Sequence, residues 1–225
     1  MRIRTSIHTP HPSSRRHALR ALAALGVASL WASPGARAHG AHGNHGPDGG
    51  HGAAAGSASA LTRSLATVTV PDATLKRETG QATALREVLA TPEAVLLNFI
   101  YTSCTTVCPV QTQVFAQVLA KVQAQRAKGG AGVRLVSVSI DPLHDTPERL
   151  AAYARQFGAG PQWHFLTGTP QASQAVQRAF DTWRGDKMNH PLVTFVRPAG
   201  AQRWVRLEGH ATATDLLREL RAPAT

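Results

Sequence analysis

Hydrophobic positions in the middle of the chain change from a strand pattern to a helical pattern and back. Val95 to Tyr101 is a compact apolar run of strand length, and Val133 to Ile140 is a second run that is rich in valine. Runs of this kind are typical of parallel strands that are covered on both faces. Pro109 to Lys128 carries valine and leucine at helical spacing and is followed by Gly129-Gly130, which predicts a helix. The pattern therefore predicts a strand, helix and strand unit.

The same alternation continues to the C-terminus. The segment Asp145-Thr146-Pro147-Glu148 offers an N-cap residue, a proline suited to a first helical turn and an acid for the helix dipole, so a helix should extend to about Phe157. Residues 61–225 thus form one predicted α/β domain, in which right-handed crossovers gather the strand ends, with Cys104 and Cys108, at one edge of the sheet. Its other predicted elements are strands at 163–166, 192–196 and 203–208 and helices at 171–182 and 212–220.

The first 38 residues are typical of an export signal. They have a basic start, an apolar stretch from Ala21 to Ala32, and Ala36-Arg37-Ala38, which has the form of a signal-peptidase site. The apolar stretch is too short for a membrane span, which needs about 20 residues. Ser14-Arg15-Arg16 also resembles a twin-arginine signal, which leaves the export route open, and a mitochondrial targeting helix is the alternative. We expect a cleaved signal peptide, a periplasmic location in a bacterium and no stable membrane span.

Residues 39–60 consist mainly of Gly, His, Ala and Ser and contain no large apolar residue. Such a segment cannot bury a core, so we predict a flexible tether. His39, His42 and His45 recur every three residues, the repeat of a polyproline-II helix, and with His51 they are further candidate ligands for copper, zinc or nickel. Cleavage after Ala38 would let the new amino group and ring of His39 chelate one metal. The alternative is that these histidines are only spacer residues.

The charge distribution argues against nucleic acid as a partner. The chain has 24 Lys and Arg against 13 Asp and Glu, a formal net charge of +11. Six of the basic residues and none of the acidic ones lie before residue 39, which leaves a net charge of +5 for the rest. No dense basic run with interleaved aromatic residues remains, so nucleic-acid binding is not expected.

The chain has only two cysteines, Cys104 and Cys108, which are too few for a disulfide framework. They lie directly after the first predicted strand and at the head of the long helix, where free N–H groups and the helix dipole stabilise a thiolate and lower its pKa. A spacing of four residues places the sulfurs about one helical turn apart, near enough to bind one metal or form a disulfide. The alternative is that both are buried and pack as small apolar residues.

These motifs resemble those of the Sco/SenC family of copper-binding proteins over about residues 67–220. The resemblance rests on Tyr101-Thr102-x-Cys104-x-x-x-Cys108-Pro109, on Val136 to Pro142, on Asp145 to Glu148 and on Leu166-Thr167-Gly168. It implies a thioredoxin-like fold with a central mixed sheet flanked by helices. It also implies a Cys, Cys, His copper site that supplies the dinuclear centre of cytochrome c oxidase. In this chain His190 occupies the position of the third ligand, although Asn189 and Pro191 depart from the family pattern around it.

The chemistry of these ligand types agrees with copper. Two thiolates favour Cu(I), and an added imidazole lets the same site hold Cu(II). Met188 is either an additional soft ligand or a packing residue. Because thioredoxin-like folds commonly carry a cis-proline facing the cysteines, we predict a cis bond between His190 and Pro191. The remaining candidates are expected in surface, turn or capping roles: Asp141, Asp145, His144, His164 and His210.

Two classes of function remain open. The first is a copper chaperone whose partner is the copper-bearing subunit of cytochrome c oxidase or another copper-transfer protein. The second is a thiol-disulfide oxidoreductase that acts on cysteines of the apo-oxidase or of another exported protein. Both need a thiol of low pKa, but only the chaperone needs His190. A peroxidase is disfavoured because Cys108 is the only residue that could resolve a sulfenic acid at Cys104.

Overall fold

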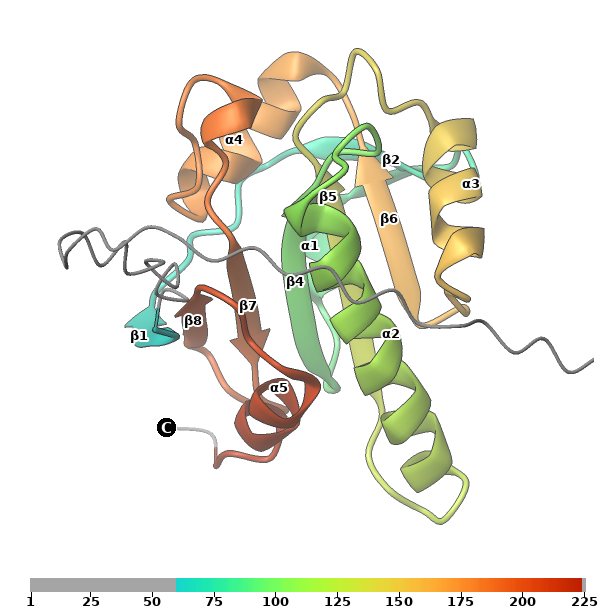
Figure 1. Ribbon diagram of the computed structural model, residues 1–225, viewed down its shortest axis with the longest axis vertical. Helices are drawn as coiled ribbons and strands as arrows, with labels where there is room; N and C mark the ends of the chain where they lie inside the picture. Colours follow the sequence, from blue (N-terminus) through green and yellow to red (C-terminus); the bar gives the residue numbers. More distant parts are fainter. Residues whose placement is uncertain (1–59, 224–225) are drawn as a thin grey trace, which may run out of the picture. The chain divides into compact units, whose positions relative to one another are not determined.

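A computed structural model describes residues 60–223 (Figure 1). These residues form an eight-stranded mixed sheet with strand order β1-β8-β7-β4-β5-β6-β2-β3. Helices cover the sheet, which confirms the α/β prediction. The predicted signal peptide and the tether histidines His39, His42, His45 and His51 lie outside the described residues. The strands are β1 (Thr62–Ala66), β2 (Thr74–Arg77), β3 (Ala82–Ala84), β4 (Ala94–Ile100), β5 (Val133–Ser139), β6 (Trp163–Thr167), β7 (Val193–Arg197) and β8 (Trp204–Glu208).

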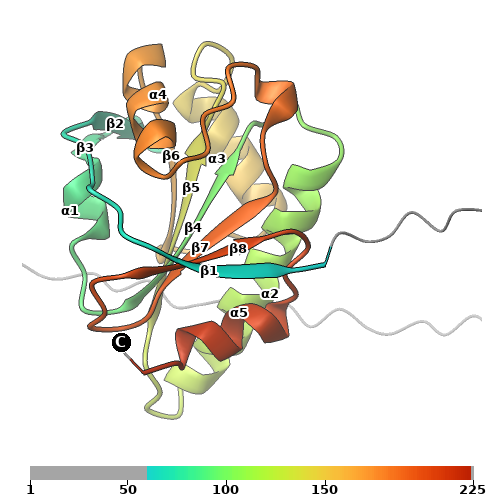
Figure 2. The same cartoon turned by 90° about the vertical axis from the view of Figure 1, so that its left-hand side faces the viewer.

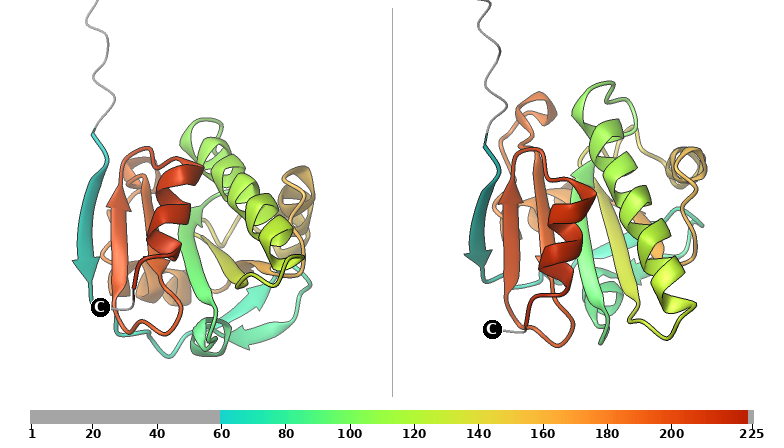
Figure 3. Two further views of the ribbon diagram at one scale, coloured as in Figure 1. Left: turned by 90° about the horizontal axis from the view of Figure 1, so that it is seen from below. Right: turned by 60° about the horizontal axis from the view of Figure 1, so that its bottom comes forward.

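Helices lie on both faces of the sheet (Figures 2 and 3). The helices α2, α3 and α5 cover one face, and the Tyr153 hydroxyl of α3 hydrogen-bonds to Thr112 of α2 at 2.9 Å. The helix α4 covers the other face, where Phe180, at its C-terminal end, contacts Phe99 of β4 and Phe195 of β7. The helices are α1 (Leu85–Leu89), α2 (Val107–Arg126), α3 (Pro147–Gln156), α4 (Pro170–Ala179), α5 (Ala213–Leu220) and a short 3-10 helix, η1 (Lys187–Asn189).

The core forms because neighbouring residues of a strand point to opposite faces and both faces are covered. Every residue of β4 is buried, as expected for a compact apolar run in the centre of a sheet. Phe99 packs beneath α4, and Asn98 points to the other face, where it meets α2. The predicted parallel pairing of β4 with β5 is confirmed, with Ala94 opposite Val133 and Ile100 opposite Ser139.

Every helix and strand predicted from the pattern is present, with ends that differ by at most three residues. The helix α2 begins at Val107, two residues before the predicted start, so Cys108 lies in its first turn. Thr146 is the N-cap of α3 and accepts a hydrogen bond from the Arg149 N–H at 3.4 Å. The structure adds β1, β2, β3, α1 and η1, which the hydrophobic pattern did not predict.

The strand ends that position the candidate site lie together at one edge of the sheet. The strand β4 ends at Ile100, and its antiparallel neighbour β7 begins at Val193. Glu208 of β8 pairs with Val193 on one side and with Thr62 on the other, so β1 also begins at this edge. The helix α5 runs away from it, because Leu220 lines a small cavity with Ala94 and Val133 at the opposite strand ends. No helix within residues 60–223 is long and apolar enough to cross a membrane.

Candidate metal centre

The two cysteines lie where β4 passes into α2. Cys104 belongs to a turn in which its N–H donates to the Tyr101 carbonyl oxygen at 3.1 Å. Cys108 follows in the first turn of α2, and its N–H donates to the Cys104 sulfur at 3.5 Å. Both are free thiols, and their exposed fractions are only 5% and 1%. The expected juxtaposition of the sulfurs at the helix head is therefore confirmed.

The two thiols differ in acidity. Burial alone would raise the pKa of Cys104, but hydrogen bonds from Cys108 and Thr106 outweigh it and lower the pKa to about 7. Burial raises the pKa of Cys108 well above its usual value, and the hydrogen bond with Cys104 adds to this rise. Cys104 is thus the thiol that ionises near neutral pH, and Cys108 donates a hydrogen bond to it. The prediction of a lowered pKa is confirmed for Cys104 and is wrong for Cys108.

A buried carboxylate braces the cysteine loop. Asp145 is fully buried and accepts hydrogen bonds from the Thr102 N–H at 3.1 Å and from the Thr102 hydroxyl at 2.6 Å. It also accepts from the Ser139 hydroxyl at 2.6 Å, which ties the loop to the end of β5. The sequence left open that Asp145 shapes the loop near the site but favoured a turn or cap role, and the cap is Thr146 instead. The position of Asp145 in the sequence, two residues before the start of α3 at Pro147, did not predict its hydrogen bonds with Thr102 and Ser139.

A second polar network connects α2 with the strands below it. The Gln111 side chain accepts from Asn98 of β4 at 3.2 Å and donates to the Val193 carbonyl and the Thr194 hydroxyl of β7, both at 2.9 Å. Asn98 in turn accepts from Ser137 of β5 at 2.7 Å. Gln111 lies three residues after Cys108, and Val193 lies three residues after His190. The network therefore fixes the cysteine helix against the strand that follows His190.

The ring of His190 is held in one tautomer. Its Nε2 lies 3.1 Å from the Phe99 carbonyl oxygen, and because a carbonyl only accepts, Nε2 carries the hydrogen. Its Nδ1 is buried and has no hydrogen-bond partner. Burial lowers the pKa of His190, so the ring is neutral and the Nδ1 lone pair is free. A hydrogen bond from one ring nitrogen to a carbonyl oxygen is usual for a histidine that binds a metal through its other nitrogen.

The structure brings His190 to the same sheet edge as the cysteines but does not assemble a complete ligand set. Among residues 60–223, no group of three His, Cys, Asp or Glu side chains is positioned to hold a metal ion. The bond between His190 and Pro191 is trans, so the prediction of a cis bond is wrong. The chain turns at η1 instead, where the His190 N–H donates to the Lys187 carbonyl oxygen at 3.2 Å. His190 then has the extended ψ of 124° that suits a residue before proline.

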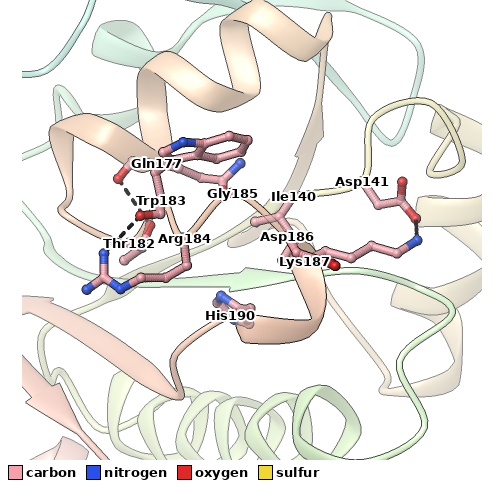
Figure 4. Close-up of a pocket in the computed structure, with 10 residues that line it drawn as sticks. All are labelled: Ile140, Asp141, Gln177, Thr182, Trp183, Arg184, Gly185, Asp186, Lys187 and His190. Carbon is pink, nitrogen blue, oxygen red and sulfur yellow. Dashed lines mark hydrogen bonds and ion pairs between the residues drawn. The ribbon is translucent and has the colours of Figure 1, made fainter.

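The segment before His190 borders a depression of about 410 Å³ (Figure 4). The Lys187 ammonium forms an ion pair with Asp141 at 2.5 Å and lies 5.4 Å from the centre of the Tyr101 ring. Asp141 was expected in a turn and here also anchors this segment, which the sequence did not indicate. The residues that line this depression include Asp141, Trp183, Arg184, Asp186, Lys187 and His190.

The other histidines of the domain belong to other surroundings. His144 and His210 are exposed, as expected. His164 of β6 is half-buried beside Arg77, and burial lowers its pKa to about 4, so the expectation of a surface position is wrong for this residue. None of the three lines the depression beside His190.

Comparison with known proteins identifies the family. The SCO1/SenC family model matches residues 66–220. The SCO1 protein homolog of Bacillus subtilis is 31% identical over 100 residues, which is 44% of this chain and 49% of that protein, so the match spans about half the length of this curated relative. The structure of Arabidopsis thaliana ScoI with copper bound has a TM-score of 0.55 at 20% identity, covering 69% of this chain and 99% of that one. BsSco, described as a member of the Sco family of cytochrome c oxidase assembly proteins and as having a disulfide switch, has a TM-score of 0.58 at 20% identity, covering 71% and 95%. These likenesses show the thioredoxin-like fold, and the match of the family model shows that the chain belongs to the SCO1/SenC family.

Proposed function

We propose that this chain is a copper chaperone that binds copper through Cys104, Cys108 and His190. The observation that carries the proposal is the unpartnered Nδ1 of His190, which lies at the same sheet edge as the acidic thiol of Cys104. A buried nitrogen without a partner costs free energy, and a metal ion would remove that cost. Binding requires the segment that carries His190 to move toward the sulfurs.

The ligand chemistry supports copper over other metals. Copper has a high affinity for soft thiolates as Cu(I), and an imidazole extends the site to Cu(II). Cys104 is ionised near neutral pH, so uptake of copper there releases a proton mainly from Cys108. The copper-bound Arabidopsis relative is consistent with this choice of metal.

We infer that the acceptor is the dinuclear copper centre of cytochrome c oxidase, or another copper-transfer protein. The description of BsSco as a cytochrome c oxidase assembly protein supports this acceptor. The sequence of residues 1–38 supports a periplasmic location, because a cleaved export signal would deliver the domain there.

The test of the ligand set is His190→Ala. We expect the variant to lose the absorption band that arises from thiolate-to-Cu(II) charge transfer, while Cu(I) binding weakens less because both thiolates remain. His144→Ala is the matched control, since His144 is exposed and far along the chain from the cysteine loop. An unchanged Cu(II) spectrum in His190→Ala would remove His190 from the site.

A second function is favoured by the unequal acidity of the thiols. An ionised Cys104 beside a protonated Cys108 is the arrangement of a thiol-disulfide oxidoreductase. The Cys104 thiolate would attack a disulfide of the partner and form a mixed disulfide. Cys108 would then lose its proton and displace the partner as a dithiol, which leaves a Cys104–Cys108 disulfide. This activity would survive His190→Ala, whereas Cu(II) binding would not.

A further inference from the structure

Met188 is an exposed thioether beside the proposed copper site. Its exposed fraction is 71%, so it is not a packing residue of the core. This excludes the packing alternative that the sequence left open. A long apolar side chain in solvent has no stabilising role in the domain, and its sulfur is a soft metal ligand.

The sulfur of Met188 is already joined to the cysteine loop through one hydroxyl group. The Tyr101 hydroxyl donates to the Met188 sulfur at 3.7 Å. The Tyr101 carbonyl oxygen in turn accepts a hydrogen bond from the Cys104 N–H at 3.1 Å. Tyr101 therefore links the Met188 sulfur to the turn that carries Cys104.

The backbone around Met188 is fixed by hydrogen bonds, whereas its side chain is largely exposed and accepts the hydrogen bond from Tyr101. The Met188 N–H donates to the Asp186 carboxylate at 2.9 Å, which caps η1. The neighbouring Lys187 is held by Asp141 at 2.5 Å (Figure 4). Its ammonium also lies over the face of the Tyr101 ring. These contacts keep the Met188 side chain over Tyr101, and its three rotatable bonds allow the sulfur to reach past the hydroxyl.

The cysteines themselves are poorly accessible. With exposed fractions of 5% and 1%, the two cysteines offer little surface to a chelator or a partner protein. An exposed ligand whose side chain can rotate toward the sulfurs would carry the ion from solvent to the cysteines. Met188 is the sulfur residue of the described chain that meets both conditions.

We propose that Met188 is an exchangeable ligand that Cu(I) meets first on entering, and last on leaving, the Cys104 and Cys108 pair. The inference rests on the proposed copper function. Copper remains Cu(I) throughout, and no electron is transferred. The neutral thioether takes one coordination position from the donor, stays as a weak and exchangeable ligand beside the two thiolates, and is the last protein ligand to leave on release.

The direct test follows the methionine methyl groups of the full-length chain by NMR after labelling with carbon-13 in the methyl position. The sequence contains two methionines, Met1 and Met188, and the signal that is lost in Met188→Leu identifies Met188. We expect this signal to shift when reduced protein receives one equivalent of Cu(I), and not when Cys104 and Cys108 are both replaced by Ser. A Met188 signal that stays in place while the cysteines bind Cu(I) would overturn the proposal.

The kinetic test measures the transfer of Cu(I) from the protein to a small chromogenic chelator. Met188→Leu preserves volume and apolar character but removes the sulfur, so we expect transfer to slow roughly three- to tenfold. Leu143→Ala is the control, because Leu143 is also highly exposed but offers no ligand, and its transfer rate should equal that of the wild type. Equal rates for Met188→Leu and the wild type would refute the role of Met188.

Copper binding by the domain and the role of Met188 can be tested separately. If the wild-type protein retains no Cu(I) against the chelator, the proposed copper function fails, and the role of Met188 fails with it. If Cu(I) is retained but neither the methyl signal nor the transfer rate depends on Met188, only the further inference fails.

Discussion

Cys104 and Cys108 illustrate how neighbouring residues of one type acquire opposite properties. The hydrogen bonds that Cys108 and Thr106 offer to the Cys104 sulfur stabilise its negative charge. Cys108 points into the core and lacks comparable donors, so burial keeps its proton in place. One sulfur is therefore prepared as a nucleophile and ligand, and the other as its hydrogen-bond donor.

We expect the rate of alkylation of Cys104 by iodoacetamide to rise as the pH increases through about 7, because the lowered pKa makes the thiolate available above that value. Cys108 should react far more slowly at every pH in this range. Peptide mapping by mass spectrometry measures both rates in one sample. In urea-unfolded protein both cysteines should titrate alike near their ordinary pKa of about 8.5. Equal rates in the folded protein would contradict the assignment.

Replacing Asp145 by Asn should destabilise the cysteine loop. The carboxylate accepts hydrogen bonds from Thr102 and Ser139, whereas an amide nitrogen cannot accept them. We expect the free energy of unfolding in urea to fall by about 2–3 kcal/mol, the range for hydrogen bonds to a buried charged group. Asp72→Asn is the control, since Asp72 is exposed and only 3.6 Å from Arg86 in a surface ion pair. A loss no larger than that of the control would show that Asp145 does not brace the loop.

At the residue scale, the sequence predicted the places of the two cysteines better than their surroundings. Cys104 and Cys108 were found because their spacing at a helix head is local information. The pKa of Cys108 and the contacts of Asp145 and Lys187 depend on packing between segments that are far apart in the chain. The trans bond before Pro191 likewise depends on its surroundings, because η1 ends at Asn189 and gives His190 an extended ψ ahead of the proline.

At the scale of elements, Gln111 connects the helix that carries Cys108 with the strand that follows His190. Its side-chain oxygen and nitrogen are both occupied, by Asn98 on β4 and by Val193 and Thr194 on β7. Buried amide groups that are fully satisfied fix one arrangement of the elements, because any shift would leave a polar atom unpaired.

Gln111→Ala should therefore lower the free energy of unfolding by about 2–3 kcal/mol, since several buried polar groups lose their partner. Gln113→Ala on the same helix is the matched control, because Gln113 is exposed and its loss should change stability by at most about 0.5 kcal/mol. Urea unfolding measures both variants. Similar stabilities for the two variants would mean that the network does not hold α2 in place.

The elements that the sequence predicted are the long ones with a clear period. The strands β4 and β5 and the helix α2 carry enough apolar positions to be recognised without tertiary context. The edge strand β1 is largely exposed, and β2 and β3 are four and three residues long, so their apolar pattern is too brief to detect. Their positions are decided by pairing with β8 and β6.

At the scale of the whole molecule, the N-terminal histidines predict a second copper-binding region that is independent of the domain. Deleting His39 to Gly52 should lower the number of copper ions bound per chain but leave the spectrum of the cysteine site unchanged. Copper bound by the deleted region should be lost as the pH falls through about 6.5, where an ordinary histidine gains its proton. Metal analysis after dialysis measures the stoichiometry. Equal copper content with and without the segment would reduce the histidines to a spacer.

The position of Thr62 determines how the domain can be joined to something else. The chain enters the sheet at the edge that holds the Cys104 loop, whereas α5 ends beside Ala94 and Val133 at the opposite edge. A fusion partner, affinity tag or solid support attached after Leu220 therefore leaves the edge with the Cys104 loop open to other proteins. The same attachment just before Thr62 would lie beside the Cys104 loop and would hinder other proteins from binding there. The start of β1 and the end of α5 therefore lie at opposite edges of the sheet, and an attachment at one does not affect the other edge in the same way.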